Sequence, residues 1–200
     1  MSKLLKSQSA PLNVTQQANH RIFAGLGWDP HEDKGLIKKA KAISQGKQMH
    51  HDLDLACYVY DKEARYICHI CAESGQQSDQ TGKIYHSGDN IEGVGDGDDE
   101  QISVELKDID PVIDSIIFAA SIKSGHSFDE ISNPEIRLAD GYSGYEFINR
   151  DLSDEALHGA NLYAFMRVYR SGDGWAMHYI DEAMSSTDGH ERPALLKKFI

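Results

Sequence analysis

The stretch DLDLACYVYD, residues 52–61, alternates apolar and polar side chains with a period of two. One face of an extended chain would present Leu53, Leu55, Cys57 and Val59. The opposite face would present Asp52, Asp54, Ala56, Tyr58 and Tyr60. Because successive residues of a strand point to opposite faces, this pattern predicts a half-buried β-strand.

Eight more short runs have the character of strands and are separated by turns rich in Gly, Asp, Asn and Ser. These runs are ARYICHI (64–70), GKIYHS (82–87), QISVELK (101–107), DSIIFAASI (114–122), PEIRLAD (134–140), YEFINRD (145–151), LYAFMRVYR (162–170) and WAMHYID (175–181). The glycines of RSGDGW (170–175) favour a tight hairpin that pairs 161–170 with 175–181. Together the runs predict an all-β protein, an antiparallel β-sandwich of two sheets.

The length and charge of the chain limit its function. Its 200 residues are enough for one domain with its own core. The formal net charge is -12, and residues 52–200 hold 29 Asp and Glu against 12 Lys and Arg. A nucleic-acid-binding protein needs clustered basic side chains, so this balance argues against that class. Cations are the expected partners.

The sequence also indicates a compartment. No apolar run is as long as a membrane span, and the N-terminal residues lack the apolar stretch of a signal peptide. Cys57, Cys68 and Cys71 are an odd number without a disulfide framework. CHIC (68–71) has no second metal-binding pair, and its cysteines would point to opposite faces of a strand, so we interpret them as structural. We expect a cytoplasmic protein.

The chain divides into three parts by composition. Residues 1–20 are polar, without periodicity, and are expected to form a flexible N-terminal arm. Residues 21–181 are expected to form the sandwich domain, with a Lys-rich insertion at about 33–50. The insertion is either a solvated amphipathic helix or a contact for an acidic protein or, peripherally, an anionic membrane surface. Residues 182–200 are expected to form a C-terminal tail.

A second stretch indicates chemistry. DNIEGVGDGDDE, residues 89–100, holds six carboxylates and three glycines without any Lys or Arg. Such carboxylates repel one another, and a hard ion such as Ca²⁺, which takes about six to eight oxygen ligands, would relieve that repulsion. The glycines permit positive φ, so that the backbone can curl round an ion. The alternative is an acidic turn that is merely solvated.

Other aspartates could complete such a site from a distance in the sequence. Asp52 and Asp54 lie two residues apart, or about 6.6 Å, on one face of the predicted strand and could share one ion or serve two. Asp29, in GLGWD (25–29), is a further candidate. An EF-hand is excluded because Ile91 and Gly93 stand where that loop needs oxygen-bearing side chains.

These segments occur in an order typical of a known family. GLGWD (25–29), DLDLACYVYD (52–61), HSGDNIEGVGDGDDEQISVEL (86–106) and LYAFMRVYRSGDGWAMHYI (162–180) resemble the TerD family of tellurium-resistance and stress-response proteins. The resemblance covers about residues 20–180. It implies a β-sandwich that binds about two Ca²⁺ ions. The ligands it implies are Asp29, Asp52, Asp54, Asp89, Asn90, Gly93 through its carbonyl, Asp96, Asp98, Asp99 and Glu100.

We expect a non-enzymatic calcium-binding or scaffold module of the class linked to tellurite, phage or colicin resistance. Its partners would be calcium ions and other proteins of a stress-response complex. The alternative is a metal-dependent phosphodiester hydrolase that uses the carboxylate cluster to hold two metals. Calcium is a poor activator of water, and the sequence shows no clear general base or basic phosphate clamp. A third hypothesis is a scaffold in which the metal only stabilises the fold and the added segments recruit other proteins.

Overall fold

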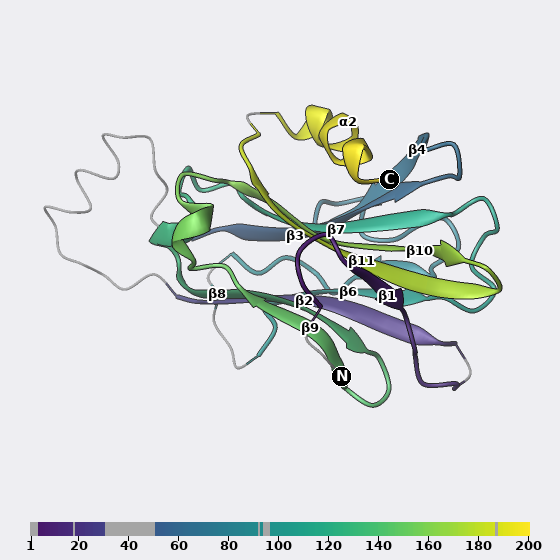
Figure 1. Cartoon of the computed structure of the whole chain (residues 1–200). Coiled ribbons are helices and arrows are strands. Elements are labelled where there is room, and N and C mark those ends of the chain that lie inside the picture. Colours follow the sequence, from purple (N-terminus) through teal and green to yellow (C-terminus); the bar gives the residue numbers. More distant parts are fainter. Residues whose placement is uncertain (1–3, 18, 31–50, 92, 94–96, 187) are drawn as a thin grey trace, which may run out of the picture.

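Two antiparallel sheets lie face to face in the computed structural model, which describes residues 4–17, 19–30, 51–91, 93, 97–186 and 188–200 (Figure 1). The predicted antiparallel β-sandwich is therefore confirmed. The Lys-rich insertion at about 33–50 lies outside the described residues. In the part of the chain that is described, no helix has the length and apolar composition needed to cross a membrane.

One sheet has six strands in the order β1-β11-β10-β7-β3-β4. They are β1 (Ser9–Pro11), β3 (Leu53–Tyr60), β4 (Tyr66–Ile70), β7 (Ser115–Ile122), β10 (Leu162–Ser171) and β11 (Gly174–Met184). The predicted hairpin is confirmed, because β10 and β11 pair antiparallel up to Ser171 and Gly174.

The other sheet has five strands in the order β5-β6-β2-β8-β9. They are β2 (Arg21–Asp29), β5 (Ile84–His86), β6 (Glu100–Glu105), β8 (Ser132–Asp140) and β9 (Glu146–Asp151). The helical turns are η1 (Phe128–Glu130), η2 (Glu155–Leu157), η3 (Gly189–Glu191), α2 (Arg192–Leu196) and η4 (Lys197–Phe199). All nine predicted runs contain a strand.

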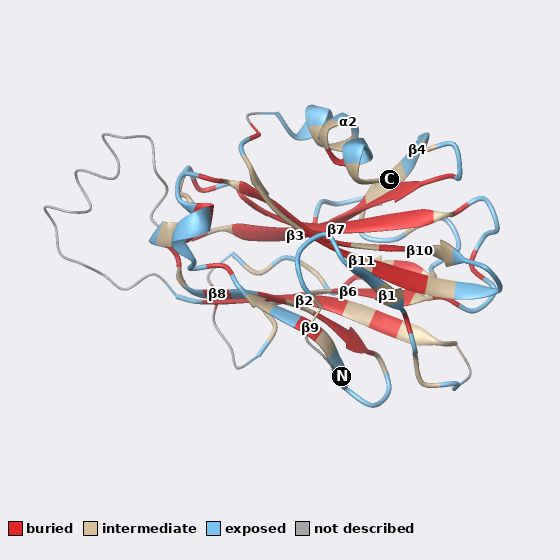
Figure 2. Ribbon diagram, in the orientation of Figure 1, coloured by how far each residue is buried: buried red, intermediate tan, exposed pale blue. Residues whose placement is uncertain are grey.

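The core lies between the sheets, where inward-facing side chains are buried (Figure 2). Leu55 and Phe118 from the six-stranded sheet and Leu26 and Ile102 from the five-stranded sheet have no exposed surface. Each fully buried side chain of this size contributes about 1.5–3 kcal/mol through the hydrophobic effect. This packing holds the ends of β3 and β6, and with them the acidic residues, in fixed positions.

Strand β3 differs from the half-buried strand that the alternation predicts, because all eight of its residues are buried. The chain end from residue 188 packs on the outer face of the six-stranded sheet, where Leu196 joins a second apolar cluster with Ala56 and Tyr58 (Figure 1). The Tyr60 hydroxyl donates a hydrogen bond to the carbonyl of Pro193 at 2.7 Å. The face that carries Asp54 is thereby partly withdrawn from solvent.

Two strands are absent from the sequence-based prediction. Residues 1–20 are predicted to form a flexible arm, yet Ser9–Pro11 pair with β11 as an edge strand and Leu12 is buried. Strand β2 is hidden in the sequence by Gly25 and Gly27, since glycine is depleted in strands. A Cβ at Gly25 would clash with the carboxylate of Asp98, so the glycine permits the close approach of Asp98 to β2.

Candidate metal centre

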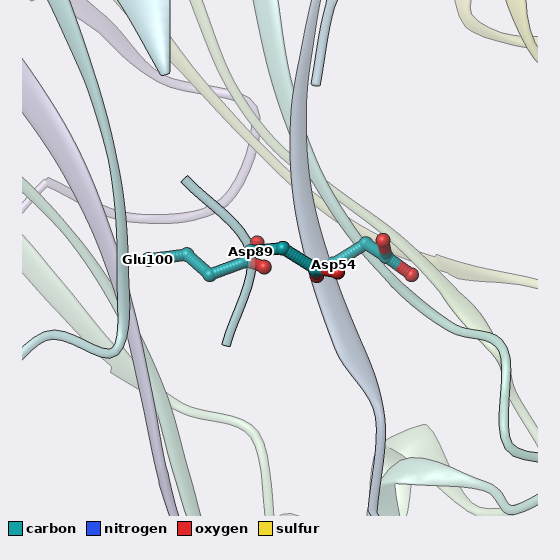
Figure 3. Close-up of side chains that lie close together, drawn as sticks. All are labelled: Asp54, Asp89 and Glu100. Atoms are coloured by element: carbon teal, nitrogen blue, oxygen red, sulfur yellow. The ribbon is translucent and has the colours of Figure 1, made fainter. Parts of the chain in front are cut away.

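Three of the predicted ligands converge at one end of the sandwich. Asp54 belongs to β3, Asp89 to the loop that follows β5, and Glu100 begins β6 (Figure 3). Each contributes a carboxylate oxygen, and these oxygens all lie within 4.8 Å of one another. The two strands come from different sheets, so the cluster spans the interface between the sheets.

Glu100 is the most deeply buried of the three carboxylates and has no exposed surface. Its Oε2 accepts a hydrogen bond from the backbone N–H of Leu55 at 2.7 Å, and its Oε1 accepts one from the N–H of Asn90 at 3.3 Å. Burial raises the pKa of Glu100, while the side chain of His86 and the Leu55 N–H oppose that rise. Glu100 thus ties β6 to β3 and to the acidic loop.

His86 lies beside Glu100, with its Nε2 at 3.3 Å from Oε2, although the pair lacks hydrogen-bond geometry. The backbone N–H of Gly88 donates to His86 Nδ1 at 3.0 Å. His86 therefore lies against Glu100 while its Nδ1 accepts a hydrogen bond from the segment that follows β5.

Asp54 is the second buried member, with 3% of its surface exposed. Its Oδ1 contacts the ammonium of Lys123 at 2.6 Å. Its Oδ2 is buried and has no hydrogen-bond partner among the described residues. Burial raises the pKa of Asp54, and Lys123 opposes this effect. A buried carboxylate oxygen without a partner is costly, and a cation at that position would satisfy it.

Asp52 and Asp89 add negative charge at the same place. Burial, followed by the charge of Asp54, raises the pKa of Asp52 to about 6, and Asp89 and Glu100 also contribute. Asp89 is exposed to solvent. Asp52 directly precedes β3 and lies two residues before Asp54. This donor set, made of carboxylate oxygens, fits a hard divalent cation such as Ca²⁺.

The other predicted acidic ligands have different partners. Asp98 forms a two-pronged ion pair with Arg137, with contacts of 2.8 and 2.9 Å. Asp99 accepts from the N–H of Trp28 at 2.9 Å, and Asp29 accepts from the side-chain amide of Asn133 at 2.6 Å. These three residues lie outside the group of converging oxygens.

Asn90 and Gly93 shape the loop. The Asn90 side chain donates to Asp99 at 2.8 Å and accepts from the N–H of Gly93 at 3.1 Å. Gly93 has a φ of +63°, and a Cβ there would meet the ring of Trp28 at 2.5 Å. Both residues therefore position the loop against β2. Asp96 lies outside the described residues.

Two neighbours of the predicted ligands were not singled out in the sequence. Arg137 forms an ion pair with Asp98, and Lys123 contacts Asp54. Lys123 directly follows β7, the neighbour of β3 in the sheet, and its backbone N–H donates to the carbonyl of Asp52 at 3.1 Å. A prediction of strand order would have placed it beside Asp52.

The cysteines have the structural character predicted for them. Cys57, Cys68 and Cys71 are free thiols. Burial raises the pKa of each of them, to about 11 for Cys68. A raised thiol pKa disfavours the thiolate, which is the form that binds metals and reacts.

Comparisons with known proteins agree with this architecture. The sequence matches the family model of the TerD domain over residues 1–187. It is 30% identical to tellurium resistance protein TerZ of Serratia marcescens, over 88% of this chain and 86% of that protein. It is 29% identical to general stress protein 16U of Bacillus subtilis (strain 168), over 86% of this chain and 85% of that protein.

Solved structures show the same fold. The crystal structure of a homologue of telluride resistance protein (TerD) from Streptomyces coelicolor A3(2) superposes with a TM-score of 0.67. The alignment covers 86% of this chain and 94% of that chain at 23% identity. At this level of identity the likeness concerns the fold alone.

Proposed function

This chain belongs to the TerD family, and we propose that it is a non-enzymatic calcium-binding module of a bacterial stress response. Asp54, Asp89 and Glu100 would hold the ion, which supplies positive charge between the two sheets. The names of the relatives, tellurium resistance and general stress proteins, support the stress-response part of this proposal. The geometry of the three carboxylates supports the part that concerns calcium.

The observation that carries the proposal is the uncompensated charge of the cluster. Three carboxylates bring a charge of -3, and Lys123, which contacts Asp54, brings +1. The sum over these four side chains is -2, which one divalent cation would balance, and Asp52 adds further negative charge. The buried Oδ2 of Asp54 would gain a partner at the same time.

Calcium suits the donor set better than smaller ions do. Three carboxylates can offer up to about six oxygens in the flexible geometry that Ca²⁺ accepts, whereas Mg²⁺ requires a near-ideal octahedron and keeps its water. A second ion would have to draw on Asp52 or on Asp29, Asp98 and Asp99, and the last three each have another partner. We propose that a second ion binds only if it displaces such a partner or shares Asp52.

The bound ion would act on the surface of the module. It would tie the acidic loop to β3 and fix the shape of one end of the sandwich, on which another protein of a stress-response complex could dock. Two ions would change the formal charge from -12 to only -8, so the protein stays anionic. Direct binding of a tellurite anion is therefore disfavoured, and we propose that any role in resistance is indirect.

Calorimetric titration of chelator-treated protein with Ca²⁺ and with Mg²⁺ tests the proposal. We expect saturable Ca²⁺ binding, weaker Mg²⁺ binding, and loss of the Ca²⁺ signal in Asp54→Asn. Asp151→Asn is the matched control, because Asp151 is exposed and its side chain accepts hydrogen bonds from the neighbouring Ser153. Absence of Ca²⁺ binding at millimolar concentration, or an Asp54→Asn variant that binds as the wild type does, would overturn the proposal.

A further inference from the structure

Lys123 occupies a position that links the candidate metal centre to a neighbouring cavity. Its ammonium contacts Asp54 Oδ1 at 2.6 Å and lies 3.6 Å from Oε1 of Glu73. Glu73 is exposed, whereas Asp54 is buried. The ammonium therefore already lies between two carboxylates, one inside the candidate centre and one outside it.

The cavity gives the Lys123 side chain room to move. It has a volume of about 370 Å³ and lies next to Asp54, under the chain end that packs on the six-stranded sheet. Asp54, Glu73 and Lys123 all line it, together with Arg192 and His190 from the chain end. A Lys123 side chain that leaves Asp54 can thus stay in a polar environment and keep a carboxylate partner in Glu73.

The backbone, by contrast, holds Lys123 in place. Its N–H donates to the carbonyl of Asp52, and β7 pairs with β3 through Ser121 and Asp54. The residue therefore cannot leave the centre, and only its flexible side chain can change partner. Because a lysine is a point charge on four rotatable carbons, such a change requires little rearrangement.

We infer that Lys123 is an internal counterion. Its ammonium contacts Oδ1 of Asp54, which a divalent cation needs in order to bind both oxygens of that carboxylate, and it moves to Glu73 when the cation binds. This inference rests on the proposed function and assigns the residue that sets the affinity of its site. The competition makes the centre selective, because a monovalent ion brings no more charge than the ammonium that it would displace. Only an ion of higher charge gains from the exchange.

Calcium titration calorimetry on the wild type and on variants of Lys123 and Glu73 tests the inference. Lys123→Met removes the competitor and should tighten Ca²⁺ binding about tenfold, which corresponds to about 1.4 kcal/mol. Lys123→Arg keeps the charge and should stay closer to the wild type. Lys6→Met is the matched control, because it removes the same charge from an exposed pair with Glu182 and should leave the affinity unchanged.

Glu73→Gln tests the exchange independently of Lys123. It removes the alternative partner and should weaken Ca²⁺ binding about threefold, the size expected for a partly exposed ion pair. In the Lys123→Met background, Glu73→Gln should have no effect, because no ammonium is then present to move to Glu73. Glu73 is exposed, so this variant leaves the fold intact even if Lys123→Met does not fold.

The outcomes separate the inference from the proposal on which it rests. Wild-type binding of Ca²⁺ with unchanged or weaker binding by Lys123→Met would overturn the counterion role and leave the calcium module standing. An equal effect of Glu73→Gln with and without Lys123 would also overturn it, because Glu73 would then act on the ion directly. Failure of both the wild type and Lys123→Met to bind Ca²⁺ would overturn both.

Discussion

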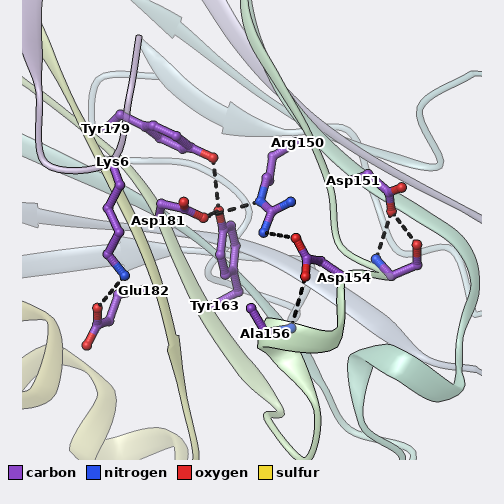
Figure 4. A network of polar contacts seen from close by, with 10 residues as sticks. Lys6, Arg150, Asp151, Asp154, Ala156, Tyr163, Tyr179, Asp181 and Glu182 are labelled. Carbon is purple, nitrogen blue, oxygen red and sulfur yellow. Dashed lines mark hydrogen bonds and ion pairs between the residues drawn. The ribbon is translucent and has the colours of Figure 1, made fainter.

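Two clusters of polar side chains in this sandwich bring their carboxylates together in different ways. In the network of Figure 4, Tyr163 donates to Asp181 at 2.6 Å, while Arg150 contacts Asp181 at 3.2 Å and Asp154 at 3.0 Å. One arginine from the five-stranded sheet thus contacts carboxylates on both sides of it. In the candidate metal centre, Lys123 contacts only one of the three converging carboxylates.

In the network of Figure 4, Asp154 and Asp181 have donors from the chain, whereas in the candidate metal centre one buried oxygen of Asp54 has none among the described residues. Arg150 links β9 to β11 across the two sheets with charges that the chain itself supplies. The Asp54, Asp89 and Glu100 cluster also links the two sheets, but it retains a net negative charge and a buried carboxylate oxygen without a partner. We therefore expect the stability of the centre, and not that of the network, to respond to calcium.

The largest effect is expected from Glu100→Ala. This substitution leaves the buried N–H of Leu55 without its acceptor and removes a proposed ligand. We expect the free energy of unfolding to fall by about 3 kcal/mol and the calcium response to disappear. Chemical denaturation with and without Ca²⁺ measures both. Glu146→Ala, at an exposed partner of Arg137, should cost far less, and equal losses in the two variants would contradict the buried role of Glu100.

Calcium itself should have the next largest effect. At a hundred times its dissociation constant, the ion should raise the free energy of unfolding by about 2.7 kcal/mol for each independent site. Asp54→Asn should lose this gain. In chelator, the same variant should be as stable as the wild type or more stable, because it removes a repelling charge. Thermal melts in Ca²⁺ and in chelator provide the measurement, and coincident wild-type transitions would count against the centre.

Tyr163→Phe tests the network around Arg150 and Asp181. Loss of the hydroxyl leaves Asp181 with fewer donors, and we expect a loss of about 1–2 kcal/mol. Because Asp154 and Asp181 already have donors from the chain itself, the loss should be the same in Ca²⁺ and in chelator. A calcium-dependent cost in a denaturant titration would show that the two clusters are coupled.

The smallest expected effect is a dependence on pH in chelator. The pKa of Asp52 rises from 3.8 to about 6 on folding, so the folded state holds a proton that the unfolded state has lost between these values. The free energy of unfolding should therefore fall as pH rises through this window. Solvent screens the partly exposed Asp52 and reduces the effect. We therefore expect the free energy of unfolding to be about 1 kcal/mol higher at about pH 5 than at about pH 7. Denaturation at the two pH values checks the sign, and Ca²⁺ should reverse it by favouring the carboxylate.

Much of the fold could be predicted because alternation along a strand is a local property. DLDLACYVYD gave the correct inward face of β3, and RSGDGW gave the correct hairpin. Burial of the outer face could not be predicted in this way, since it results from the packing of Leu196 across a long sequence separation. Strand β2 escaped prediction because its glycines serve contact with Asp98 and Gly97 rather than strand propensity.

The acidic residue types of the candidate site could be predicted from the sequence, but the basic residues that pair with them could not. Acidic residue types and their spacing indicated oxygen ligands, and the structure brings Asp54, Asp89 and Glu100 together. Spacing contains no information on partners in other strands, so the pairing of Asp98 with Arg137 and of Asp54 with Lys123 emerged only from the sheet order. These basic partners determine which of the carboxylates remain for a metal.

A crystal structure of this chain grown with millimolar Ca²⁺ tests the candidate metal centre most directly. We expect an ion bound by oxygens of Asp54, Asp89 and Glu100, with the Lys123 ammonium moved from Asp54 towards Glu73. Water alone between the three carboxylates, with Lys123 still in contact with Asp54, would contradict this expectation.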